Sequence, residues 1–182
     1  MDARTSVPSP VNEPVLTYAP GSAEREELLR QLAVLQASSI DLPATIGGES
    51  RLGSGEPMDV VQPHAHAKVL GTMHNATADD AKAAVAAAKD AAASWRALSY
   101  DDRAAVFLKA AELLAGPWRQ TLNAATMLGQ SKTVGQAEID AACELIDFWR
   151  FNVHFGRQLL EEQPAANSPG IWNRLDHRPL EG

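Results

Sequence analysis

Three acidic residues on one face of a predicted helix could recognise a cation. Asp140, Glu144 and Asp147 are four and three residues apart, which places their side chains on the same side of an α-helix. No Lys or Arg lies three or four residues from Glu144, so the helix itself offers this carboxylate no partner. Such a row is most often a solvated helix face, because like charges at this spacing cost only a few tenths of a kcal/mol.

The aromatic residues of the same helix favour a buried position for the row. Apolar groups lie nearly all round the helix, which predicts that it is largely buried. A buried carboxylate needs a cation or hydrogen-bond donors from elsewhere. Glu144 therefore either recognises a ligand cation or ammonium group, or forms a structural ion pair with another segment. The aromatic residues are Phe148, Trp149, Phe151 and Phe155.

Other residues that could do chemistry have a structural explanation. Cys143 has no histidine three or four residues away and falls on the apolar stripe of its helix, which predicts a buried, inert thiol. The GQSK stretch at 129–132 is typical of a helix end rather than of a Ser–Lys catalytic pair. His64 and His66 have no carboxylate or cysteine at ligand spacing, so no metal site is expected. No GxGxxG or Walker motif is present, so no residue is assigned to cofactor binding.

Composition indicates a single soluble globular domain. The chain has 182 residues, of which 45% are hydrophobic and 21% charged. A net charge of −7 argues against nucleic acid or an anionic membrane as a partner. The single cysteine excludes an internal disulfide and suits a reducing compartment. With no secretory signal and no apolar run long enough to span a bilayer, a cytoplasmic location is expected.

The pattern along the chain predicts an extended arm, a short helix, hairpin strands and then a series of helices. Prolines among polar residues indicate the arm over 1–20, and glycine pairs separate the short β-prone runs. Thr77, Ser99 and Thr133 are each followed three residues later by an acid or glutamine, which predicts helix starts. The expected helices are 22–36, 77–96, 99–115, 117–129 and 133–162, and the expected strands are 43–46, 50–52, 57–62, 67–73 and 171–182.

The last of these helices has a regular apolar stripe. Its members are three and four residues apart, which is the period of one buried helix face. They are Ile139, Ala142, Cys143, Ile146, Trp149 and Val153.

Four stretches of the sequence carry a family resemblance: NEPVLTYAPGS, DRAAVFLKAAELLAGPWR, NAATMLGQSKTVGQAEIDAACELIDFWRFN and WNRLDHRPLEG. Together they resemble the N-terminal part of the Δ1-pyrroline-5-carboxylate dehydrogenases, a branch of the aldehyde dehydrogenase superfamily. The resemblance covers nearly the whole chain. The third stretch is long and specific to this branch, whereas the alanine-rich helix expected over 77–96, with its Ser94-Trp95 pair, is a weaker, superfamily-wide pattern.

The resemblance implies an enzyme of proline catabolism. Such an enzyme oxidises L-glutamate γ-semialdehyde, the open form of Δ1-pyrroline-5-carboxylate, to L-glutamate with NAD, as a homo-oligomer. In the family a cysteine thiolate attacks the aldehyde, hydride passes to the nicotinamide, and a glutamate activates water. In this branch the second glutamate of AEIDAACELIDFWRFN reaches the α-ammonium group of the substrate, and that position is Glu144.

The family's nucleophile loop, similar to GQKCSA, and its oxyanion loop, similar to PFNF, are missing from these residues. The chain by itself is therefore expected to contain no catalytic residue and to be inactive. The alternative is a non-catalytic helical interaction module that associates with a complete aldehyde dehydrogenase.

The fold that the resemblance implies is α/β, the N-terminal part of an aldehyde dehydrogenase fold. It would consist of an arm and short helix over 1–40, a β-hairpin segment over 41–75 and the helical part of the NAD-binding domain over 76–170. Residues 171–182 would begin an oligomerisation hairpin.

Overall fold

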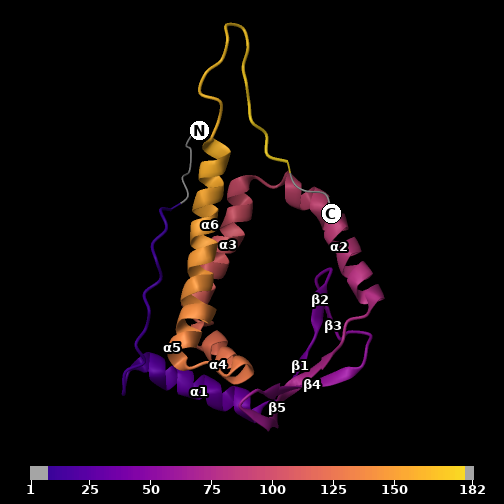
Figure 1. The fold of residues 1–182 in the computed structure, drawn as a ribbon, viewed down its shortest axis with the longest axis vertical. Helices are drawn as coiled ribbons and strands as arrows, with labels where there is room; N and C mark the ends of the chain where they lie inside the picture. Colours follow the sequence, from indigo (N-terminus) through magenta and orange to yellow (C-terminus); the bar gives the residue numbers. More distant parts are fainter. Residues whose placement is uncertain (1–7, 179–182) are drawn as a thin grey trace.

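The structure is a computed structural model that describes residues 8–178. The first part of the predicted arm, 1–7, and the end of the predicted last strand, 179–182, lie outside the described residues. Helices and short strands are segregated along the chain and in space: α3 and α6 run side by side, and the small sheet lies beyond α1 and α4 (Figure 1). The elements in chain order are α1 (Ala23–Ala37), β1 (Ile40–Leu42), β2 (Ala44–Ile46), β3 (Glu49–Arg51), β4 (Pro57–Gln62), β5 (Ala65–His74), α2 (Ala78–Ala97), α3 (Tyr100–Ala115), α4 (Arg119–Gln130), α5 (Val134–Ala137), the π-helix η1 (Glu138–Cys143) and α6 (Glu144–Glu161).

The strands form two separate sheets. β2 and β3 are an antiparallel hairpin whose two-residue turn is Gly47-Gly48, both at positive φ (63° and 83°), as a tight hairpin turn requires. The other sheet has the order β1-β5-β4, in which β4 and β5 are antiparallel. β1 was not predicted. It pairs in parallel with β5, with Ile40 opposite Gly71, and a three-residue strand of this kind has too little pattern to be seen in the sequence.

The predicted helix starts are confirmed by their caps. The Thr77 side chain accepts a hydrogen bond from the Asp80 backbone N–H, and the Asp80 carboxylate accepts one from the Thr77 backbone N–H, which forms a capping box. Ser99 caps α3, and Thr133 forms a second capping box with Gln136. One start was misplaced: α4 begins at Arg119, so Pro117 precedes the helix instead of opening it.

The helix predicted over 133–162 is interrupted by the π-helix η1. Glu138 and Ile146 are eight residues apart and both have 0% exposure. An uninterrupted α-helix would turn them about 80° apart, whereas a π-turn that absorbs one residue brings them to within about 20°. The predicted stripe is therefore wrong at Ile139, which is 45% exposed, because the wider turn puts Glu138 on the buried face instead.

Two small apolar clusters hold the helices together. One joins α3 to η1 and α6 through Ala111, Leu114, Ala142 and Ile146. The other joins the arm and α1 to α4 through Tyr18, Leu28 and Ala124. Alanines at these contacts allow the helix backbones to approach closely. α2 contributes no buried residue, and its Val85 is 59% exposed.

The C-terminal stretch forms no strand within residues 171–178. After α6 the chain forms a long loop that extends away from the helices and then turns back toward α2 (Figure 1). A strand needs a neighbouring strand, and no described strand pairs with residues 171–178. The backbone of Leu175 bonds instead to the Gln163 side chain, donating to its amide oxygen at 3.0 Å and accepting from its amide nitrogen at 3.2 Å. Among residues 8–178, no helix combines the length and apolar character needed to cross a membrane.

Candidate functional site

The three acids of the predicted row have different surroundings. The Lys132 ammonium lies 2.7 Å from the Asp140 carboxylate. The carboxylate of Asp147 accepts hydrogen bonds from the Asn12 side-chain amide and the Glu13 backbone N–H, both at 2.7 Å. Within residues 8–178 the side chain of Glu144 has neither a hydrogen bond nor an ion pair. Asp140 and Asp147 therefore have partners within the protein, whereas Glu144, between them, has none among the described residues.

Glu144 is positioned by the junction between η1 and α6. Its backbone N–H donates to the carbonyl of Ile139, five residues earlier, which is the closing bond of the π-turn. Single π-turns are common at functional sites. The Glu144 side chain is exposed, so no ion pair with another described segment satisfies it.

Three phenylalanines lie on the same side of α6 as Glu144. Phe148, Phe151 and Phe155 follow it by four, seven and eleven residues, which places them within about 40° of it around the helix. Phe148 is 59% exposed and Phe155 is 50% exposed, and the rings of Phe151 and Phe155 are 6.0 Å apart. The expectation that α6 is largely buried is therefore wrong for this face, because the described chain packs only against its other side. The result is a carboxylate at one end of an open aromatic row.

The buried acid of this region is Glu138, which was not predicted from the sequence. It has 0% exposure and forms an ion pair with Arg119, whose side chain is 6% exposed. Its carboxylate also accepts hydrogen bonds from the Tyr18 hydroxyl at 2.7 Å, the Asn123 amide at 2.8 Å and the Leu16 backbone N–H at 2.8 Å. Its spacing gave only a partial signal: Glu138 precedes Ala142 by four residues, but a regular α-helix would place it about 80° from Ile146, and the π-turn is needed to bring it onto the buried face.

The N-terminal arm is fastened to this buried cluster. Glu13 lies between two guanidinium groups, 2.6 Å from Arg119 and 2.7 Å from Arg150. The Arg119 guanidinium also donates to the carbonyl of Pro14 at 2.7 Å. The arm was predicted to be extended, and these contacts explain how an extended segment without regular hydrogen bonding keeps a defined path across α4 and α6.

The electrostatics of the cluster keep its charges in place. Burial by itself would raise the pKa of Glu138, but the hydrogen bonds from Arg119, the Leu16 backbone, Tyr18 and Asn123 outweigh it and hold the pKa below its ordinary value. Burial and the neighbouring Glu138 carboxylate raise the pKa of the Tyr18 hydroxyl to about 12. Tyr18 therefore stays protonated and donates its hydrogen bond throughout the physiological range.

Cys143 is buried, as predicted. Its side chain is 5% exposed, and burial, with Glu138 close by, raises the pKa of the thiol to about 11. A thiol of this kind is a poor nucleophile near neutral pH. The GQSK stretch is a helix end, also as predicted: α4 stops at Gln130, and Ser131 adopts a left-handed conformation with φ of 56°.

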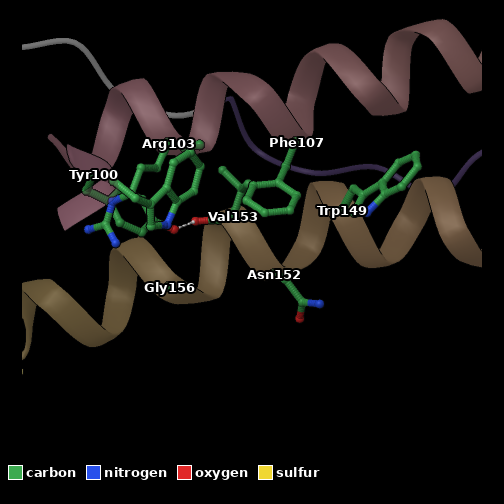
Figure 2. Close-up of a pocket in the computed structure, with 9 residues that line it drawn as sticks. Tyr100, Arg103, Phe107, Trp149, Asn152, Val153 and Gly156 are labelled. Carbon is green, nitrogen blue, oxygen red and sulfur yellow. Dashed lines mark hydrogen bonds between the residues drawn. The ribbon is translucent and has the colours of Figure 1, made fainter. Parts of the chain in front are cut away.

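A cavity of about 410 Å³ lies between α3 and α6 (Figure 2), on the side of α6 opposite Glu144. Val153, in its wall, follows Glu144 by nine residues, about 180° around the helix. The Tyr100 hydroxyl donates to the Val153 carbonyl beside the cavity, and the Asn152 side chain points away from the aromatic group (Figure 2). The lining is mainly aromatic and aliphatic: Trp95, Tyr100, Arg103, Ala104, Phe107, Trp149, Asn152, Val153 and Gly156.

The histidines and acids of residues 8–178 form no group of three or more that could hold a metal ion. His64 lies instead against the end of α4, where its Nδ1 is 2.8 Å from the Ser131 hydroxyl oxygen. The chemistry that the described site offers is therefore that of Glu144, an unpartnered carboxylate beside aromatic rings, which suits a cationic or ammonium group.

Comparison with known proteins gives a consistent family. Residues 51–182 match the model of the aldehyde dehydrogenase family. The chain is 46% identical over 180 residues to the mitochondrial delta-1-pyrroline-5-carboxylate dehydrogenase of Dictyostelium discoideum, covering 99% of this chain and 32% of that protein. A delta-1-pyrroline-5-carboxylate dehydrogenase of Agaricus bisporus is 44% identical, with 99% and 33% covered.

A solved structure agrees with these relatives. The Delta-pyrroline-5-carboxylate dehydrogenase of Mycobacterium tuberculosis, bound with NAD, is 64% identical and superposes with a TM-score of 0.97. The match covers all of this chain and 34% of that one, so the chain spans about a third of the length of the relatives it matches. The similarity confirms that the fold is the N-terminal part of an α/β aldehyde dehydrogenase fold, and the chain belongs to the aldehyde dehydrogenase family.

Proposed function

We propose that this chain is the N-terminal segment of an NAD-dependent dehydrogenase that oxidises L-glutamate γ-semialdehyde to L-glutamate. The support is the agreement of the relatives, which are named as delta-1-pyrroline-5-carboxylate dehydrogenases and match almost the whole chain. This semialdehyde carries an α-ammonium group, and the described residues present one unpartnered carboxylate beside an aromatic row. The proposal assigns substrate recognition to this segment.

Glu144 is the residue that binds the α-ammonium group in this proposal. The observation that carries the assignment is the contrast within the acidic row, where Lys132 satisfies Asp140 and the arm satisfies Asp147, while Glu144 has no partner among residues 8–178. A carboxylate that meets an ammonium group forms a charge-assisted hydrogen bond, which is stronger than a neutral one. Phe148, beside Glu144, would exclude water from part of that contact.

NAD enters the proposal through the relatives, because the described residues do not fit the cofactor by themselves. At the start of α2 the Asp80 N–H is engaged by the Thr77 side chain, and at the start of α3 the Asp102 N–H is engaged by the Ser99 side chain. No glycine-rich loop opens either helix, so neither offers a phosphate site. The assignment of residues 76–170 to an NAD-binding domain, and of 171–182 to an oligomerisation hairpin, is part of the same proposal.

The 182 residues are proposed to be inactive without the rest of the enzyme. Their one cysteine, Cys143, is buried with a raised pKa and does not face the Glu144 side of α6. Homo-oligomer formation and a cytoplasmic location stay predictions; the relative from D. discoideum is named as mitochondrial.

The test compares two substrates in the dehydrogenase that carries this segment. Glu144→Gln should lower kcat/KM for L-glutamate γ-semialdehyde, because it removes a charge-assisted hydrogen bond to the ammonium group. The expected loss of transition-state stabilisation is about 1.5–3 kcal/mol. Glutarate semialdehyde has the same carbon chain without the amino group, and its kcat/KM should stay near that of the unmodified enzyme. Equal losses on both substrates would show that Glu144 is structural and overturn the assignment.

A further inference from the structure

A lysine ammonium is paired with the acid that lies one helical turn before the unpartnered carboxylate. Lys132 and Asp140 form an ion pair at 2.7 Å, with side chains 31% and 41% exposed. Asp140 precedes Glu144 by four residues, which puts the two on the same side of the helix whether the turn between them is counted as α or as π. The carboxylate that holds this ammonium group is thus about one helical turn from the carboxylate of Glu144.

Lys132 is kept near the row by the turn that carries it. It follows Ser131, the left-handed residue that ends α4, and it precedes the capping box of Thr133. Because its backbone is fixed at this point, the Lys132 side chain can reach only a few carboxylates of η1 and α6. The Asp147 carboxylate is not available to Lys132, because it already accepts hydrogen bonds from the Asn12 side chain and the Glu13 backbone N–H.

The group that Lys132 presents is the same group that the proposed substrate presents. An ammonium tethered within the molecule competes at an effective concentration in the millimolar range, which is high for a free metabolite to overcome. Without Asp140, Glu144 would be the remaining open carboxylate on this side of the helix. The Lys132 ammonium would then pair with Glu144 in place of the ammonium group of the substrate.

We propose that Asp140 is a specificity-determining residue: by pairing with Lys132 it keeps Glu144 open to the α-ammonium group of an amino-acid aldehyde. This inference rests on the proposed function of Glu144. Asp140 acts through Lys132 and touches neither the aldehyde nor the cofactor, so it is a positioning residue. A part-exposed pair contributes little to folding stability, so its removal should leave the protein folded.

The experiment measures KM and kcat of the full dehydrogenase for L-glutamate γ-semialdehyde and for glutarate semialdehyde. Asp140→Asn should raise KM for the amino substrate about fivefold, which corresponds to the energy of one surface charge pair. Its kcat for the amino substrate should not change, and neither should KM or kcat for glutarate semialdehyde. The double variant Asp140→Asn with Lys132→Met should restore KM for the amino substrate. Lys132→Met alone is the matched control and should not raise that KM.

Two results would overturn the inference. One is an Asp140→Asn enzyme with unchanged KM for the amino substrate, and the other is a double variant as impaired as Asp140→Asn alone. Glu144→Gln, measured in parallel, separates this failure from that of the proposed function. If Glu144→Gln impairs only the amino substrate while Asp140→Asn changes nothing, the role of Glu144 stands and that of Asp140 falls.

Discussion

Arg119 and Glu138 form an ion pair that is almost wholly shielded from solvent, with side-chain exposures of 6% and 0%. The pair links α4 to the π-turn that precedes Glu144, and the same guanidinium reaches Glu13 and the Pro14 carbonyl of the arm. The arm, α4 and η1 therefore depend on one pair of charges, although Glu13 of the arm is 106 residues from Arg119. Such a pair is costly to break, because each partner is left buried and uncompensated.

Glu138→Gln should destabilise the chain strongly. Removing one member of a buried ion pair costs about 3–5 kcal/mol, since Arg119 would remain buried without its main counter-charge. Glu112→Gln is the matched control: Glu112 pairs with Lys109 at 3.0 Å, but their side chains are 70% and 60% exposed. Its expected cost is at most about 1 kcal/mol. Chemical denaturation measures both, and similar values for the two variants would contradict a dominant role for the buried pair.

The pH dependence of stability should also depend on Glu138. Its pKa is held below the ordinary value in the folded chain, so it adds stability above its unfolded pKa of about 4.3, and this contribution is lost as the pH falls through the lower folded pKa. The free energy of unfolding should therefore decrease as the pH drops below about 4. In Glu138→Gln this decrease should be smaller, whereas Glu112→Gln should follow the unmodified chain. Denaturation curves recorded between pH 3 and 7 would measure this difference. An equal loss of unfolding free energy at acidic pH in all three proteins would contradict the prediction.

Cys143 should behave as a packing residue. With its pKa raised to about 11 by burial, the thiol stays protonated near pH 8 and should react with iodoacetamide far more slowly in the folded chain than in denaturant. Cys143→Ala in the complete dehydrogenase should retain near-normal kcat, because no step of the proposed reaction uses this sulfur. Fast labelling of the folded chain, or loss of turnover in a folded Cys143→Ala enzyme, would show that the thiol is reactive.

The contact between α3 and α6 should be sensitive at Gly156. A Cβ at this position would overlap the Tyr100 hydroxyl group, which donates to the carbonyl of Val153. Gly156→Ala should therefore cost about 1–3 kcal/mol, as overpacking in a tight contact usually does. Gly129→Ala is the control, since an added Cβ there meets no atom within 4 Å and alanine favours the helix. Thermal melting should separate the two; equal shifts would mean that α3 and α6 separate easily.

Local structure was largely predictable because it depends on neighbouring residues. Helix starts follow from side chains that cap backbone N–H groups three residues away, as at Thr77 and Thr133, and the turn at Gly47-Gly48 follows from the positive φ that glycine tolerates. The burial of Cys143 followed from its position on the apolar stripe. The family was also visible, because long stretches such as AEIDAACELIDFWRFN are characteristic of it.

The partners of the acids were decided by the tertiary structure. Sequence spacing placed Asp140, Glu144 and Asp147 on one face, but which of them stays open depends on Lys132 and on an arm residue, Asn12, 135 positions before Asp147. The buried acid proved to be Glu138, because a π-turn adds one residue and rotates it onto the core side, and no rule of helical period contains that insertion. Sequence alone thus determined the helices and the family, whereas long-range pairing of charges determined which carboxylate is buried and which remains available.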